Sequence, residues 1–111
     1  MSHELLVKEA LRRQQVFKEL GEHLKRMEAL VKEADPQAEV YLIGSVAEGR
    51  HVFSSDIDVL VLTEKKADEI LKKLWEAGVE DPFQIHVKTP EAFREWREKV
   101  VAIKVSEFLR K

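Results

Sequence analysis

The chain contains no cysteine among its 111 residues. This absence excludes disulfide bonds, catalysis by a thiolate and zinc sites built from cysteine. Long hydrophobic runs are also missing, because no apolar stretch approaches the roughly 20 residues that a membrane-spanning helix requires. The first residues, Met1 to Glu4, lack the charged-then-apolar pattern of a secretory signal peptide. We therefore expect a cytoplasmic protein that has no contact with a membrane.

The chain also lacks a large net charge of either sign. The sequence has 19 Lys and Arg against 21 Asp and Glu, a formal net charge of −2. Because the two signs are interspersed, no broad positive field exists to hold nucleic acid, which is therefore not an expected partner. The length and an apolar content of 44% predict a single globular domain over residues 1–111 with one hydrophobic core.

Hydrophobic periodicity predicts an α/β (α+β) fold. Apolar residues recur at steps of three, four or seven over residues 3–34, which predicts one long N-terminal helix ending at Asp35-Pro36. Gly21 is a weak point or a bend within it. Because this stripe is longer than a small sheet can cover, its first two turns are candidates for contact with a partner. Further elements are predicted as strands over Glu39–Ile43, Ile57–Leu62 and 82–88, a helix over 65–77, and a last helix starting at Thr89-Pro90.

The most informative motif joins the first two predicted strands. Gly44-Ser45 ends the first strand, ten residues follow, and Asp56-Ile57-Asp58 opens the second. Residues two apart on a strand face the same side, so Asp56 and Asp58 should project together. Paired carboxylates suit Mg²⁺ or Mn²⁺, which completes its shell with water and substrate phosphates. The alternative is that the two carboxylates only solvate the start of a strand.

The Gly-Ser half predicts a phosphate site beside the metal site. Gly44 lets another group approach the backbone closely. Ser45 is placed to cap a short helix over residues 46–50, whose free N–H groups would hold phosphate. Arg50 is a candidate bidentate donor to a triphosphate oxygen, and Ser55 is a candidate phosphate contact because it adjoins the aspartates. An ordinary surface arginine and a turn-capping serine are the plainer alternatives.

This Gly-Ser, ten-residue, Asp-x-Asp pattern resembles the signature of the minimal nucleotidyltransferases, small relatives of the DNA polymerase β superfamily. The likeness is close over residues 40–62, and the order of elements is similar to about Trp96. The resemblance implies a small mixed sheet with helices mainly on one face. It also implies Mg²⁺-dependent transfer of AMP from ATP. On this resemblance we expect the tail, residues 99–111, to be helical, although Val101, Ile103 and Val105 also alternate like a strand.

The resemblance further implies a protein partner. Minimal nucleotidyltransferases are often antitoxins of helical HEPN-type ribonucleases, which they neutralise by attaching AMP to a tyrosine or by binding. The shortness of the chain favours an acceptor hydroxyl delivered by such a partner. A homodimer through the long N-terminal helix or an adjacent edge is a further expectation. A free-standing transferase that acts on RNA ends or a small molecule is the weaker alternative.

One position departs from the family pattern. The family has a third carboxylate on the strand that corresponds to residues 83–87, where alternation turns Gln84 and His86 toward the site. Glutamine can offer a carbonyl oxygen to a metal, but it neither neutralises the ion nor accepts a proton. His86 is a candidate catalytic base or acceptor-orienting group, or simply a polar strand residue. The alternative function is therefore a weak or inactive nucleotide-binding antitoxin that acts by binding.

Overall fold

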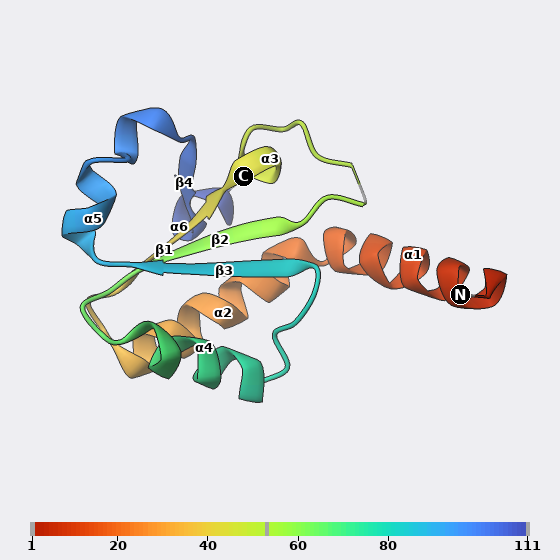
Figure 1. The fold of residues 1–111 in the computed structure, drawn as a ribbon, viewed down its shortest axis with the longest axis horizontal. Coiled ribbons are helices and arrows are strands. Elements are labelled where there is room, and N and C mark those ends of the chain that lie inside the picture. Colours follow the sequence, from red (N-terminus) through yellow and green to blue (C-terminus); the bar gives the residue numbers. More distant parts are fainter. Residues whose placement is uncertain (1, 53, 111) are drawn as a thin grey trace.

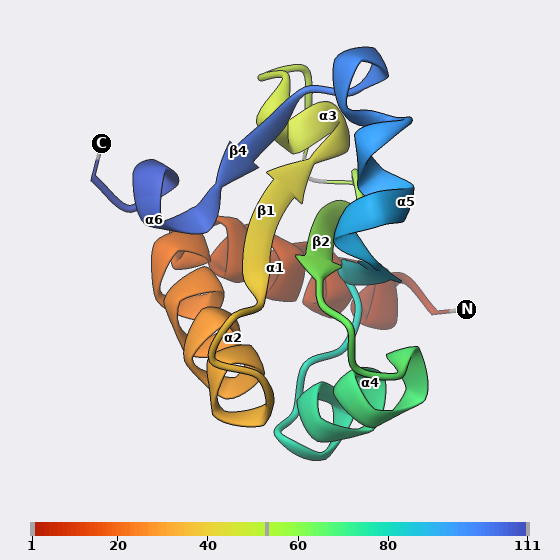
Figure 2. The ribbon, with the colours of Figure 1, turned by 90° about the vertical axis from the view of Figure 1, so that its left-hand side faces the viewer.

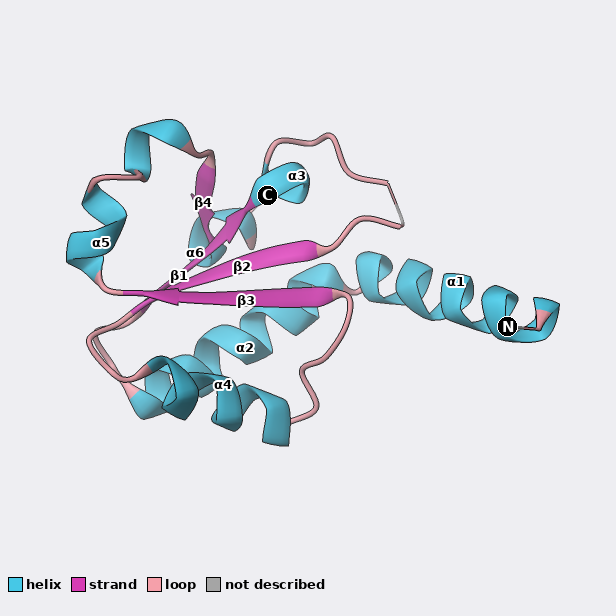
Figure 3. Ribbon diagram, in the orientation of Figure 1, coloured by secondary structure: helices cyan, strands magenta, loops and turns pink. Residues whose placement is uncertain are grey.

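A computed structural model describes residues 2–52 and 54–110, and its helices and strands are drawn in Figures 1 and 3. The elements are, in chain order, α1 (His3–Lys18), α2 (Leu20–Ala34), β1 (Glu39–Ile43), α3 (Gly44–Ala47), β2 (Ile57–Leu62), α4 (Ala67–Glu76), β3 (Phe83–Lys88), α5 (Pro90–Arg94), the 3₁₀ turn η1 (Arg97–Lys99), β4 (Ala102–Lys104) and α6 (Val105–Phe108). The first two strands have the predicted bounds. The side chain of Thr89 caps α5 and Pro90 begins it, as the sequence predicts.

The strands form one mixed sheet in the order β3-β2-β1-β4. β1 is antiparallel to both of its neighbours, whereas β2 and β3 are parallel. Parallel neighbours need a crossover connection, and α4 supplies it. This mixed four-stranded sheet with helices is the predicted fold class.

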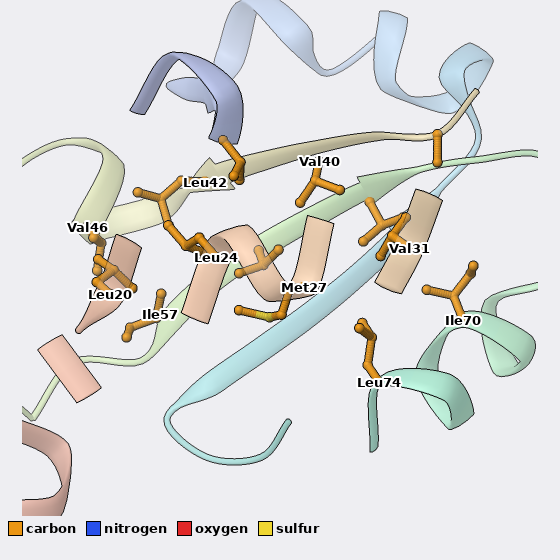
Figure 4. Packing of buried hydrophobic residues seen from close by; sticks show 14 residues of the cluster. Leu20, Leu24, Met27, Val31, Val40, Leu42, Val46, Ile57, Ile70 and Leu74 are labelled. Carbon is orange, nitrogen blue, oxygen red and sulfur yellow. The ribbon is translucent and has the colours of Figure 1, made fainter. Parts of the chain in front are cut away.

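The two faces of the sheet are covered unequally. On one face α2 and α4 pack against alternate strand residues to form the main core, part of which is shown in Figure 4. Its buried members include Leu24, Met27, Val31, Val40, Leu42, Ile57, Val59, Val61, Ile70 and Leu74. On the opposite face Phe93 of α5 covers a smaller cluster, and Figure 2 shows α5 on the side away from α2 and α4. The smaller cover leaves part of this second face accessible.

The predicted N-terminal helix is interrupted. Glu19, with φ −106° and ψ 22°, separates α1 from α2, so the break lies two residues before Gly21. Leu20, Leu24, Met27 and Val31 of α2 are buried as the stripe predicts, but none of the described residues of α1 is buried. α1 runs past the end of the sheet (Figure 1), because the sheet is too short to cover both helices.

The prediction of a helical tail is wrong for Ala102–Lys104. This segment is β4, which pairs antiparallel with β1, Tyr41 opposite Lys104. Strand pairing is favoured here because β1 would otherwise present a row of unpaired backbone groups at the sheet edge. The helix α6 begins only at Val105. Among the described residues, no helix combines the length and apolar character needed to cross a membrane.

Candidate active site

The end of β1 and the start of β2 bring Gly44 and Asp58 together. Ile43 is the register partner of Asp58, so the next residue, Gly44, lies beside the carboxylate. Gly44 has φ +74°, and a Cβ atom built on it would lie 2.5 Å from Asp58 Oδ2. A side chain at residue 44 would therefore collide with the carboxylate. The close approach predicted for this glycine is made by Asp58.

The helix that follows the Gly-Ser pair differs from the prediction. α3 spans Gly44–Ala47 and its N-cap is Ile43, so Ser45 lies inside the helix. The predictions of a cap at Ser45 and a helix over residues 46–50 are wrong, because the helix starts directly at the strand end. The Ser45 carbonyl accepts a hydrogen bond from the Arg50 N–H at 2.9 Å, which closes the turn after α3. A nucleotide contact of Ser45 stays a prediction.

Asp58 shares its face of the sheet with two polar residues of β3. In the parallel register Gln84 lies opposite Asp58. His86 Nε2 lies 3.1 Å from Asp58 Oδ1, and the two side chains are 43% and 30% exposed. Phe83 and Ile85 point to the other face and pack against the main core. The alternation read from the sequence is confirmed, and it brings Asp58, Gln84 and His86 to one side.

Asp56 lies just before β2, with 53% of its side chain exposed. Its Oδ1 is 3.9 Å from Nη2 of Arg13, a residue of α1. Arg13 is not among the site residues expected from the sequence. The contact joins segments far apart in the chain, and no local pattern in the sequence signals it.

The two loop residues proposed as phosphate contacts are engaged within the protein. Arg50 Nη2 pairs with Glu48 Oε1 at 3.1 Å, and its side chain is 69% exposed. The Ser55 Oγ accepts a hydrogen bond from the Val52 N–H at 3.0 Å, which closes a turn. Both arrangements match the plainer alternatives. Phosphate contacts by Arg50 and Ser55 stay predictions.

A cavity of about 520 Å³ opens on this face of the sheet. Its lining includes Gly44, Asp58 and His86 from the sheet end and Trp96 and Lys99 from the segment that follows α5. Lys88 also lines the cavity, with Nζ 5.0 Å from the centre of the Trp96 ring. The volume lies in the range of about 300–1,000 Å³ typical of small-molecule sites. An ammonium and an aromatic ring thus share the cavity lining with the Asp58 carboxylate.

The acidic side chains fit one divalent ion better than two. Mg²⁺ commonly uses one or two carboxylates together with substrate phosphates and water. Asp56 and Asp58 are the candidate carboxylates. Within the described part of the chain, no group of three His, Cys, Asp or Glu side chains is placed to hold a metal. Gln84 stands opposite Asp58, where a third acid would complete such a group. Binding of one divalent ion by Asp56 and Asp58, together with a phosphate ligand, stays a prediction.

Comparison with known proteins gives two findings. A family model described as "Nucleotidyltransferase domain" matches residues 20–108, which leaves α1 outside the matched segment. The chain is also similar to a crystal structure of a protein assigned as a candidate nucleotidyltransferase. The two share 27% sequence identity with a TM-score of 0.61, over 74% of this chain and 96% of the other. Among curated proteins, none matches this chain significantly.

Proposed function

Since the chain belongs to the nucleotidyltransferase domain family, we propose that it transfers AMP from ATP to a hydroxyl group of a partner protein, with Mg²⁺ or Mn²⁺ as the metal. The observation that carries this proposal is the Asp58 carboxylate, which is packed against Gly44, hydrogen-bonded to His86 and open to the cavity. Asp56 is the second carboxylate of the predicted metal pair.

The proposed reaction is a displacement at the α-phosphorus of ATP. The acceptor oxygen forms a bond to this phosphorus while the bond to the bridging oxygen breaks and pyrophosphate leaves. The metal stabilises negative charge on the phosphate oxygens. When His86 donates Nε2–H to Asp58, its Nδ1 carries a lone pair that can take the proton of the acceptor hydroxyl. Asp58 thereby has two functions, metal binding and orientation of His86.

A protein acceptor is supported by the exposed apolar surface of α1. Leu5, Leu6 and Leu11 are 55%, 55% and 58% exposed. These side chains lie on the helix that the family model leaves unmatched. Exposed apolar side chains gathered on one projecting helix are typical of a protein contact surface. A helical HEPN-type protein is the partner that we propose, and a homodimer through α1 is the competing arrangement.

The direct test is transfer of label from α-³²P-ATP. Purified protein, Mg²⁺ and labelled ATP are incubated with the protein encoded by the adjacent gene. We expect label on the partner, and its loss in Asp56→Asn and Asp58→Asn. Asp68→Asn is the matched control, because Asp68 is an exposed carboxylate in the first turn of α4. Equal labelling in all four proteins would rule out the proposed site.

A second candidate function is favoured by Gln84. Without a third carboxylate opposite Asp58, transfer is slow or absent and the protein neutralises its partner by binding. This candidate predicts a tight complex in which the partner is neutralised with little or no label at any Mg²⁺ concentration. Neutralisation that requires Asp58-dependent labelling would exclude it.

A further inference from the structure

Arg13 is the point at which α1 meets the segment that carries Asp56. Its Nη2 donates to the Ser54 carbonyl at 3.1 Å and to the Ser55 carbonyl at 2.6 Å. Nη1 of the same guanidinium pairs with Asp81 Oδ2 at 2.8 Å. Only 13% of the Arg13 side chain is exposed. A planar guanidinium with several fixed donors can hold three acceptors in this way, whereas an ammonium is a single point of contact.

The acceptors of Arg13 belong to the two segments that lead into β2 and β3. Asp81 lies in the turn before β3, and the Ile57 N–H at the start of β2 donates to the Pro82 carbonyl at 2.8 Å. Arg13 therefore connects α1 to both strands that supply the predicted site residues. Phe17 of α1 adds a stacking contact with His51, with ring centres 5.2 Å apart.

From these contacts we propose that Arg13 is a positioning residue for Asp56. By holding the carbonyls of Ser54 and Ser55, Arg13 keeps the Asp56 carboxylate ordered for binding a divalent cation together with Asp58. The inference rests on the proposed function for its metal. It goes beyond that function because it gives a residue outside the matched family segment a role in the site.

Two effects of Arg13 on metal binding have opposite signs. Its charge, 3.9 Å from Asp56 Oδ1, competes with a cation for the carboxylate. This competition is weak, because the Asp56 side chain is 53% exposed and solvent screens its charge. The hydrogen bonds from Arg13 already order the backbone before Asp56, so metal binding costs less conformational entropy. The hydrogen bonds dominate, so loss of Arg13 weakens metal binding.

Arg12 offers a matched control. It is also an arginine of α1 bound to Asp81, with Nη1 2.8 Å from the carbonyl and Nη2 3.0 Å from Oδ2. Its Nε and Nη2 also donate to Glu9, on the same helix. Arg12→Ala thus removes a charge and contacts with Asp81 while it leaves the bonds to Ser54 and Ser55 in place.

The first measurement is the affinity for Mn²⁺ alone, followed by electron paramagnetic resonance of the free ion. We expect the dissociation constant to rise about tenfold in Arg13→Ala and to stay within twofold of wild type in Arg12→Ala. Arg13→Lys keeps the charge but not the fork of donors, so it should also weaken binding. Unchanged or tighter binding in Arg13→Ala, or an equal loss in Arg12→Ala, would overturn the proposal.

The second measurement uses metal-free protein and therefore does not depend on the proposed function. Amide hydrogen exchange at Ser55 and Ile57 should be at least tenfold faster in Arg13→Ala than in Arg12→Ala, with exchange at Leu42 in β1 as the internal reference for global stability. Equal exchange in the two variants would overturn the positioning role. If wild-type protein binds no Mn²⁺ but the exchange difference is present, the proposed metal site is wrong. The ordering of the Ser54–Ser55 backbone by Arg13 is then still supported.

Discussion

Gly44 and Asp58 are so close that no side chain fits between them. A Cβ atom on residue 44 would lie 2.5 Å from Oδ2 and 3.3 Å from Cγ of Asp58. The backbone of residue 44 also has φ +74°, a region that L side chains rarely adopt. The glycine of the Gly-Ser motif is thus required by the carboxylate, independently of any phosphate contact.

Gly44→Ala should move the Asp58 carboxylate and weaken the metal site. Gly49→Ala is the matched control, because Gly49 has φ +73° and no described atom lies within 4 Å of its built Cβ. Both variants should lose about 1–2 kcal/mol of unfolding free energy from backbone strain. Gly44→Ala should lose ~1–3 kcal/mol more from the collision, together with at least tenfold in Mn²⁺ affinity. Urea unfolding and Mn²⁺ titration measure the two effects, and equal losses in both variants would contradict the role of the close contact.

The features that the sequence predicts correctly are those set by residues close together in the chain. The strands Glu39–Ile43 and Ile57–Leu62 are nearly continuous apolar runs bounded by polar turns, so neighbouring residues determine where they begin and end. Alternation in 83–88 likewise predicts that Gln84 and His86 share the face of Asp58. The break at Glu19 depends instead on where the sheet ends beneath the helix. The bond from Arg13 to the Ser55 carbonyl joins residues 42 positions apart. Such contacts are fixed only by the assembled fold.

His86→Gln should separate the two functions proposed for this residue. The glutamine amide can still donate to Asp58 Oδ1 but cannot act as a base. We expect Mn²⁺ affinity within threefold of wild type and AMP transfer reduced about hundredfold, the lower end of what a positioned base contributes. Normal transfer by His86→Gln would show that His86 only holds Asp58.

A prediction on pH and stability comes from Asp35, the residue that ends α2. The hydroxyl of Thr63 donates to Asp35 Oδ2 at 2.5 Å, and the Gln37 N–H donates to Oδ1 at 3.0 Å. The hydrogen bond from Thr63, followed by that from Gln37, lowers the pKa of Asp35 below its ordinary value. A lowered folded-state pKa means that this stabilisation is present above the unfolded-state pKa of about 3.9 and is lost as the pH falls through the folded-state pKa.

Thr63→Val should therefore be less stable than wild type near neutral pH, and the difference should shrink in acid. Thr63 is buried, with 2% of its surface exposed, so valine of similar shape preserves the packing while it removes the donor. Urea midpoints of the two proteins measured between about pH 7 and 2 test the sign. A difference that is constant or grows toward low pH would show that the hydrogen bond to the ionised Asp35 is not its source.

Gln84→Glu should restore a third carboxylate opposite Asp58. In metal-free protein the new charge faces Asp58 across the β2–β3 pair, and like charges on adjacent strands destabilise a sheet. The thermal midpoint without metal should therefore fall. Mg²⁺ binds the folded state more tightly once a third carboxylate is present, so the midpoint should rise more on adding Mg²⁺ than in wild type.

The same substitution should increase Mn²⁺ affinity about tenfold, equivalent to ~1.4 kcal/mol, and raise the rate of AMP transfer. Gln84→Met is the control, because it retains the length of the side chain without an oxygen ligand. Differential scanning calorimetry with and without Mg²⁺ tests stability, and labelled ATP tests transfer. If Gln84→Glu and Gln84→Met respond alike to Mg²⁺, residue 84 does not contact the metal, and its position opposite Asp58 has only a structural role in the sheet.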